Sequence, residues 1–427
     1  MSSILNRKKP TIYYGYIIIA ASFLITTIVS GNQYSFGVFF KPMLDQFGWT
    51  RASTSGPFSL NLILIGLFSI LTGRLSDRFG PRIVITLGAV IMGSGYLLMS
   101  RISNLWQLYG SYGIIVALGS SAMYVPLVAM MSKWFSKKRG LMVGIGVSGV
   151  GFGISIVPPV ASQLMISLNW HTSIFILGAS SLILITLAAQ FLKAEPGAEL
   201  LKENKDEIAQ PVGRSAGLSF SESVKTTQFW MIVVAWFLYG FFYQVGMVHI
   251  VPYATDMGMS TLAAATILTT IGLIGIFGRI ILGLTGDRFS NKNTLLISFV
   301  LLAVAFATLS ISRTIVMIYA FAAIFGSFFG VGILLAPIAA EYFGFKELGV
   351  IAGAIYFGNN IGGAIGPVFA GYIFDITGKY EIAFISSGIT AILAAVFMGL
   401  LKPAPALEAT TSVNYLSANL NSTDTKT

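Results

Sequence analysis

One arginine stands out because it is the only charged residue in a long apolar run, from Thr269 to Gly283. If this run crosses a membrane, the guanidinium of Arg279 costs roughly 2.5–3.5 kcal/mol on insertion scales. Deprotonation cannot relieve that cost, because arginine stays charged in proteins. The charge should therefore face a polar cavity and a negative partner, and a guanidinium binds a carboxylate through two parallel hydrogen bonds. The run predicts an anion site at Arg279; an arginine paired with backbone carbonyls or a neighbouring helix is the alternative.

Residues in other apolar segments could complete such a site. Asn359 and Asn360 interrupt a glycine-rich segment and could hydrogen-bond a carboxylate or a hydroxyl, although amides also join membrane helices to one another. Aromatic side chains could wall a small apolar pocket around the anion, with packing or lipid contact as the alternative for each: Tyr34, Tyr124, Phe329 and Tyr356.

His249 lies in the run Met247–Pro252, near the end of another apolar segment. Its unperturbed pKa is near neutrality, so it is a candidate for a proton-sensing group or an outer gate; an interfacial histidine bonded to a carbonyl is the alternative. The chain has no cysteine, and His171 is far from His249 in the sequence, so neither histidine belongs to a cluster with metal-ligand spacing. A Walker motif is also absent from the sequence, and we expect no cofactor.

The composition indicates which elements position these residues. Hydrophobic residues make up 55% of the chain and charged residues 10%, whereas soluble domains carry about 25% charged residues. We therefore expect a membrane protein in which nucleic acid is not a partner, because the basic residues lie in short loops. Twelve apolar segments are long enough to span a bilayer: approximately 13–40, 54–73, 83–100, 105–132, 140–162, 170–192, 228–252, 260–283, 294–311, 314–341, 349–374 and 381–401.

The loops differ in charge on the two sides of the membrane. Of the 26 Lys and Arg residues, twenty lie on the side of the two chain ends. Five lie on the opposite side, and Arg279 lies within a segment. By the positive-inside rule, both termini are expected in the cytoplasm, with the protein in the plasma (inner) membrane.

The second half of the sequence repeats the first. Asp77-Arg78-Phe79-Gly80 recurs as Asp287-Arg288-Phe289-Ser290, and Trp134-Phe135 recurs as Tyr342-Phe343 at nearly the same offset. Parallel six-helix repeats with a substrate site between them are typical of transporters. We expect the following division: a bundle at 1–192, a cytoplasmic linker at 193–227, a bundle at 228–404 and a disordered tail at 405–427. Within the linker, Ser219–Glu222 fits a capping box and predicts a short helix.

These motifs resemble those of the major facilitator superfamily. Gly73–Arg82 is similar to its loop motif between helices two and three, and the resemblance covers all twelve segments. The stretch from Trp134 to Leu141, with the glycines that follow it, resembles the fifth-helix signature of monocarboxylate transporters. Gly31–Ser35 is similar to the oxalate:formate antiporter branch. The resemblance implies an all-α membrane fold of two pseudo-symmetric six-helix bundles.

The resemblance also assigns residues. Arg279 matches the eighth-helix arginine that holds the substrate carboxylate, and Tyr124 matches a cavity tyrosine of the oxalate carriers. Where those carriers have a second cation, this chain has Asn359 or Asn360. Animal monocarboxylate carriers have an aspartate where this chain has Gly275 and a first-helix lysine about where it has Tyr34. A site with one cation instead of two favours a substrate with one carboxylate.

The repeated loop motif suggests a charge latch. Asp77 beside a helix N-terminus, with Arg78, and the equivalent Asp287 and Arg288 are expected to hold the two bundles in one state. Substitution of Asp77 should then slow turnover more than it weakens binding.

Together these features predict a secondary active transporter of small monocarboxylates, lactate- or pyruvate-like, working by alternating access with proton symport. An anion exchanger of the oxalate/formate type and a nutrient sensor built on a transporter fold are the alternatives. A membrane enzyme is not expected, because no spanning segment carries a nucleophile with its base, a metal cluster or a carboxylate pair. The expected partners are the monocarboxylate, H⁺ and the bilayer, without nucleotide.

Overall fold

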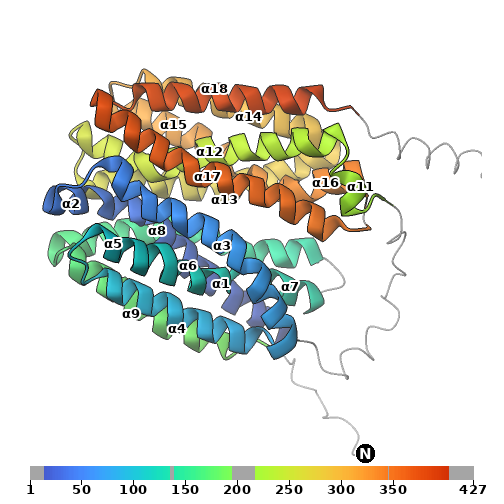
Figure 1. The fold of residues 1–427 in the computed structure, drawn as a ribbon, viewed down its shortest axis with the longest axis horizontal. Coiled ribbons are helices and arrows are strands. Elements are labelled where there is room, and N and C mark those ends of the chain that lie inside the picture. The colour runs from blue at the N-terminus through green and yellow to red at the C-terminus, as the bar shows by residue number, and fades with distance from the viewer. Residues whose placement is uncertain (1–13, 135–138, 195–216, 345, 403–427) are drawn as a thin grey trace, which may run out of the picture.

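The computed structural model of the chain describes residues 14–134, 139–194, 217–344 and 346–402 (Figure 1). The expected tail at 405–427, most of the expected linker and residues 135–138 of the fifth-helix signature lie outside the described residues. So do the side chains of Asp77 and Asp287. Nearly all described residues are helical, as the apolar segments predict.

The first half of the structure covers residues 14–194. Its elements are α1 (Tyr14–Tyr34), α2 (Phe36–Phe47), α3 (Arg51–Phe79), α4 (Pro81–Met99), α5 (Leu105–Leu108), the π-helix η1 (Tyr109–Val116), α6 (Ala117–Ser121), α7 (Tyr124–Trp134), α8 (Arg139–Ser167) and α9 (Trp170–Ala189).

The second half covers residues 217–402. Its elements are α11 (Phe220–Ser223), α12 (Thr227–Asp256), α13 (Thr261–Phe289), α14 (Asn291–Ser310), α15 (Ile315–Phe328), the 3-10 helix η3 (Phe329–Leu334), α16 (Leu335–Phe343), α17 (Leu348–Thr377) and α18 (Glu381–Leu400). The sequence repeat is visible in the bounds, because α3 and α13 have the same length and end at the two repeated motifs.

Among the described residues, twelve helical stretches are long and apolar enough to cross a membrane, which confirms the predicted number. The largest difference in bounds is in the first span, which continues through α2 to Phe47. The predicted capping box is confirmed at α11, where the Ser219 and Glu222 side chains each bond the other's backbone N–H. The Ser219 hydroxyl and the Ser219 backbone N–H both donate to Oε2 of Glu222, and these bonds lower the pKa of its carboxyl below the ordinary value.

Two spans are broken in the middle. The fourth passes through η1 and, after a turn at Ala122 and Met123, resumes as α7 at Tyr124. The tenth changes from α15 to the 3-10 helix η3 at Phe329. Irregular backbone at membrane depth is tolerated where it is buried in protein or lines a cavity. Both breaks place a candidate site residue, Tyr124 or Phe329, at the start of a new segment.

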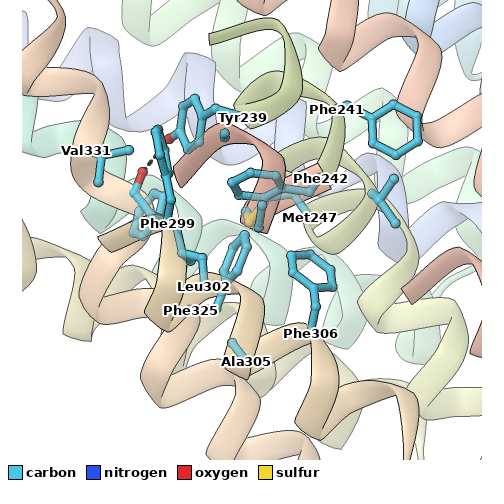
Figure 2. Packing of buried hydrophobic residues seen from close by; sticks show 14 of the residues in the cluster. Tyr239, Phe241, Phe242, Met247, Phe299, Leu302, Ala305, Phe306, Phe325 and Val331 are labelled. Atoms are coloured by element: carbon cyan, nitrogen blue, oxygen red, sulfur yellow. Dashed lines mark hydrogen bonds between the residues drawn. The ribbon is translucent and has the colours of Figure 1, made fainter. Parts of the chain in front are cut away.

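Each half has its own apolar core. In the second half, aromatic rings from α12, α14 and α15 pack edge to face between the helices, and Figure 2 shows Phe242, Phe306 and Phe325 gathered there. A separate core joins the helices of the first half. Figure 1 shows the halves as two packed layers, with α12–α18 above α1–α9 in that view.

The two halves meet at one end of the molecule. We call this the loop end; it holds the turns 48–50, 257–260 and 378–380 and lies on the left in Figure 1. There α2 packs on α12, while α3 packs on α17 and α8 on α13 from this end as far as Gly66 and Gly151. Thr269 donates to the Ser155 carbonyl at 2.7 Å, and the Tyr34 and Tyr243 hydroxyls lie 2.9 Å apart. Every hydrogen bond between the halves in the described part of the chain lies at these positions or nearer the loop end.

Candidate functional site

Arg279 extends from the middle of α13 toward the first half. Its Nη1 is buried and has no hydrogen-bond partner among the described residues. The guanidinium carbon lies 4.8 Å from the centroid of the Phe329 ring. Across the interface, Nη1 faces α8, 3.1 Å from where a Cβ on Gly151 would stand. The ion pairs in the described part of the chain lie elsewhere. A buried cation is costly unless it is paired, so Arg279 is prepared for an anion that binds between the halves.

Tyrosines surround this guanidinium. The Tyr34 and Tyr243 hydroxyls share a hydrogen bond, and Tyr239 donates to the Phe329 carbonyl at 2.5 Å. The Tyr243 ring stacks on the Phe329 ring at 5.9 Å. The Phe329 ring, which lies against Arg279, thus connects these tyrosines to the guanidinium. Tyr239 and Tyr243 are absent from the sequence-based candidates, although their spacing of four residues places them on one helix face.

Two further candidate tyrosines are accessible and belong to different halves. Tyr124 on α7 is 51% exposed and Tyr356 on α17 is 49% exposed. Each lies in the part of its span that is farther from the loop end.

The adjacent amides Asn359 and Asn360 point to different neighbours. The Asn359 Oδ1 lies 2.9 Å from where a Cβ on Gly240 of α12 would stand. The Asn360 Nδ2 lies 3.0 Å from the equivalent point on Gly66 of α3, in the first half. Both atoms are buried without a partner in the described part of the chain. Neither atom therefore makes the interhelical hydrogen bond that a purely structural amide would make.

Phe329 explains why Gly275 is a glycine. A Cβ at Gly275 would lie 1.9 Å from Cε1 of the Phe329 ring, which fills the place beside Arg279. An aspartate at this position, such as the resemblance to animal carriers would suggest, has no room while the ring is there.

We therefore expect Gly275→Asp to express poorly and to lose uptake, since its carboxylate would collide with Phe329. Combining it with Phe329→Ala should recover folding, because the ring no longer occupies that space. The measurement is the yield and thermal stability of the purified variants. Equal stability of Gly275→Asp and the unmodified protein would contradict the packing described above.

His249 is fully buried at the loop end, away from Arg279. Its Nε2 lies 2.8 Å from the Pro367 carbonyl, which only accepts, so Nε2 donates. Its Nδ1 lies 3.0 Å from the Tyr380 hydroxyl. Arg51 donates to that hydroxyl at 2.6 Å, which leaves the Tyr380 proton for Nδ1. These partners fit a neutral imidazole with its proton on Nε2.

Arg51 is the centre of a network between the halves at the loop end. Its Nη2 pairs with Asp256 at 2.6 Å, and Lys41 pairs with the same carboxylate at 3.1 Å. The Asp375 carboxylate accepts the backbone N–H groups of Arg51 and Ala52, each at 2.8 Å. It therefore caps the N-terminus of α3 from the other half, where a negative charge is favoured by the helix dipole. We call Lys41, Arg51, Asp256, Asp375 and Tyr380 the loop-end network.

The arginines of the predicted latch lie at the opposite end of the molecule. Arg78 and Arg288 are exposed, and each guanidinium lies over the next residue's ring, Phe79 at 5.2 Å and Phe289 at 5.6 Å. Neither arginine pairs with a carboxylate among the described side chains. The described residues also contain no group of His, Cys, Asp and Glu that could hold a metal ion.

The Major Facilitator Superfamily profile matches residues 22–340 and 280–416 of the chain. Mouse monocarboxylate transporter 12 is 27% identical over 420 residues, covering 91% of this chain and 85% of that protein. Bovine monocarboxylate transporter 13 is 26% identical over 381 residues, covering 88% of this chain and 86% of that protein.

Two solved structures have a similar fold. One is a bacterial homolog of the human lysosomal transporter Spinster, in an inward-facing and occupied conformation. It aligns with a TM-score of 0.74 at 14% identity, over 91% of this chain and 97% of that chain. The other, the nucleoside transporter NupG (D323A mutant), aligns with a TM-score of 0.73 at 15% identity, over 91% of this chain and 100% of that chain. The family match, the relatives and this fold agree, so the chain belongs to the major facilitator superfamily and is a membrane transporter rather than an enzyme.

Proposed function

We propose that the chain is a secondary active transporter of small monocarboxylates, lactate- or pyruvate-like, that moves its substrate together with a proton. The observation that supports this most directly is the buried, unpartnered Nη1 of Arg279 at the contact between the halves. The guanidinium would hold the carboxylate bidentately. Tyr34, Tyr124 and Tyr356 would contact the rest of a small organic acid, and Phe329 would hold the guanidinium in place. The names of the relatives agree with this substrate class.

Transport would proceed by alternating access, with residues 1–192 rocking against 228–404. Among the described residues, hydrogen bonds join the halves at the loop end and as far as Tyr34 and Thr269, but not beyond. We therefore assign a state closed at the loop end and open at the other. With both termini in the cytoplasm of a plasma-membrane protein, this state is inward-open. The latch of Asp77, Arg78, Asp287 and Arg288 would close in the opposite state.

The proton would travel with the substrate. No aspartate or glutamate lies in the middle of a spanning segment of this sequence, so the proton cannot pass along a relay of carboxylates. When no substrate is bound, the unpaired charge of Arg279 slows the movement of the two halves between their states. A bound carboxylate neutralises that charge. A proton moved in the same step makes the cycle electroneutral. Transport by this route needs no titration of His249, whose two nitrogens are already bonded.

Uptake into proteoliposomes tests this proposal. We expect uptake of labelled lactate or pyruvate to rise as the external pH falls, and to be insensitive to membrane potential because the substrate and the proton cancel in charge. The control is the same vesicle loaded with a counter-anion at equal pH. Uptake that requires the internal anion and ignores the pH gradient would favour exchange of the oxalate/formate type.

Competition should separate acids by their number of carboxylates. Lactate and pyruvate should inhibit uptake far better than oxalate or malonate, because a second carboxylate would be buried without a cation to pair with. The measurement is the inhibition constant of each acid against the same labelled substrate. Equal inhibition by malonate would mean that a second cation reaches the site.

A further inference from the structure

Three amide side chains with unsatisfied polar atoms lie around the contact between the halves. They are Gln244 on α12 and Asn359 and Asn360 on α17. The Gln244 Oε1, Asn359 Oδ1 and Asn360 Nδ2 atoms are all buried without a hydrogen-bond partner among the described residues. Native proteins satisfy nearly all buried polar groups, so a cluster of exceptions calls for a partner. Gln244 is absent from the sequence-based candidates.

The amides are continuous with the Arg279 site. Gln244 follows Tyr243, whose hydroxyl lies 2.9 Å from that of Tyr34 and whose ring stacks on Phe329 beside Arg279. The Gln244 Cγ lies 3.0 Å from where a Cβ on Gly363 would stand, on the helix that carries both asparagines. Gly240, which contacts Asn359, lies one helical turn before Gln244. A substrate group that extends from the carboxylate past Tyr243 would reach these side chains.

The amides add acceptors to a site whose charged residue, Arg279, has only donors. The Phe329 carbonyl already accepts from Tyr239, and the Tyr34 and Tyr243 hydroxyls are bonded to each other. The Gln244 and Asn359 oxygens have no partner among the described residues, so they offer acceptors to a second polar group on the substrate, beyond its carboxylate. Asn360 presents an unpartnered Nδ2, and its amide offers an acceptor as well when it rotates by half a turn.

We propose that Gln244, with Asn359 and Asn360, forms a specificity subsite for monocarboxylates that also carry an O–H or N–H donor close to the carboxylate. This inference rests on the proposed monocarboxylate transport through Arg279. Asn360 packs against Gly66 of the other half, so rocking of the halves changes what the amides face. The substrate's donor engages them as the halves close around it, and an acid without a donor leaves them unpaired.

The test compares acids that have or lack the donor: lactate carries a hydroxyl that propionate lacks, and N-acetylsarcosine has a methyl group in place of the N–H of N-acetylglycine. Inhibition constants are measured against labelled lactate for lactate with propionate, and for N-acetylglycine with N-acetylsarcosine. The unmodified protein should prefer the donor-bearing member of each pair by roughly tenfold, the effect of one buried hydrogen bond. Gln244→Met keeps the size of the side chain but removes its acceptor and its donors. It should bring both ratios close to one, through weaker binding of lactate and N-acetylglycine.

Two more variants complete the experiment. Gln190→Met makes the same substitution at the end of α9, where the amide bonds Arg82 far from the site, and should keep the wild-type ratios. Asn360→Leu, similar in size to asparagine, repeats the test on the other helix if Gln244→Met is unstable. Ratios near one in the unmodified protein, or unchanged ratios in the folded Gln244 and Asn360 variants, would overturn the subsite while leaving carboxylate transport intact. Inhibition by none of the four acids would refute the proposed transport itself.

Discussion

Arg279→Lys should abolish saturable uptake while leaving a folded protein in the membrane. Lysine keeps the positive charge but loses the planar fork that holds a carboxylate with two hydrogen bonds. Loss of one partner of a buried, hydrogen-bonded charge pair costs about 2–5 kcal/mol, which corresponds to at least about 30-fold in affinity. Initial rates of uptake, with binding measured on the purified protein, give the comparison. Arg313→Lys, an exposed arginine of the same half, is the matched control and should behave as wild type.

A second variant separates an anion site from a structural arginine. Arg279→Met removes a guanidinium whose Nη1 is buried and has no partner in the described part of the chain. The variant should unfold at the same or a higher temperature, because an unpaired buried charge is costly. The substrate should stabilise the unmodified protein, by about 2.7 kcal/mol at a hundred times its Kd, and should not stabilise the variant. A large loss of stability in Arg279→Met, or uptake by either variant, would refute the anion site.

The spans were predictable because length and hydropathy are strong signals. The repeat was predictable from two short motifs, and α3 and α13 match from end to end. Glycines of the fifth-helix signature have a packing reason: a Cβ at Gly153 would lie 2.1 Å from the Thr27 carbonyl oxygen of α1. In the second half, a Cβ at Gly362 of α17 would likewise lie 1.8 Å from the Phe237 carbonyl oxygen of α12. One helix thus approaches another closely in both halves.

The composition of the site was only partly predictable. Arg279 is visible in the sequence because a charge in an apolar run is rare. Tyr239 and Tyr243 were missed because α12 is rich in aromatic residues, and a sequence does not tell a site-facing ring from one facing lipid. The different surroundings of Asn359 and Asn360 follow from helix geometry, since successive residues point about 100° apart on a helix of 3.6 residues per turn.

The loop-end network could not be read from the sequence. Arg51, Asp256 and Asp375 each stand near a helix end, where charged residues are common and usually solvated. Their pairing depends on how the two halves meet, because Arg51 is 205 residues from Asp256 and 324 residues from Asp375 in the sequence. Its consequence is mechanical: these bonds join the halves at one end of the transporter and must break when that end opens.

Arg51→Gln should therefore shift the transporter toward the state that is open at the loop end. Arg51 is 8% exposed, pairs with Asp256 and donates to Tyr380. Because Asp256 is partly solvated, loss of the Arg51 guanidinium should cost the closed state about 1–3 kcal/mol. That changes the ratio of the two states by about 5- to 150-fold. Asp375→Asn should act in the same direction, since it weakens the cap on α3. His249→Ala, which removes neutral hydrogen bonds only, should have a smaller effect.

Distances between spin labels report the shift directly, and the absence of cysteine from the sequence leaves no background labelling. Labels at Asp45→Cys and Lys379→Cys, exposed positions at the loop end on different halves, should move apart in Arg51→Gln. Labels at Phe79→Cys and Phe289→Cys, at the other end, should approach one another, because rocking about a central site opens one end as it closes the other. Arg101→Gln removes an exposed loop-end arginine that lies within one half and should change neither distance. If the loop-end distance grows while the other stays fixed, the network is a local seal and the halves do not rock as rigid bodies; if neither changes in Arg51→Gln, the network does not set the resting state.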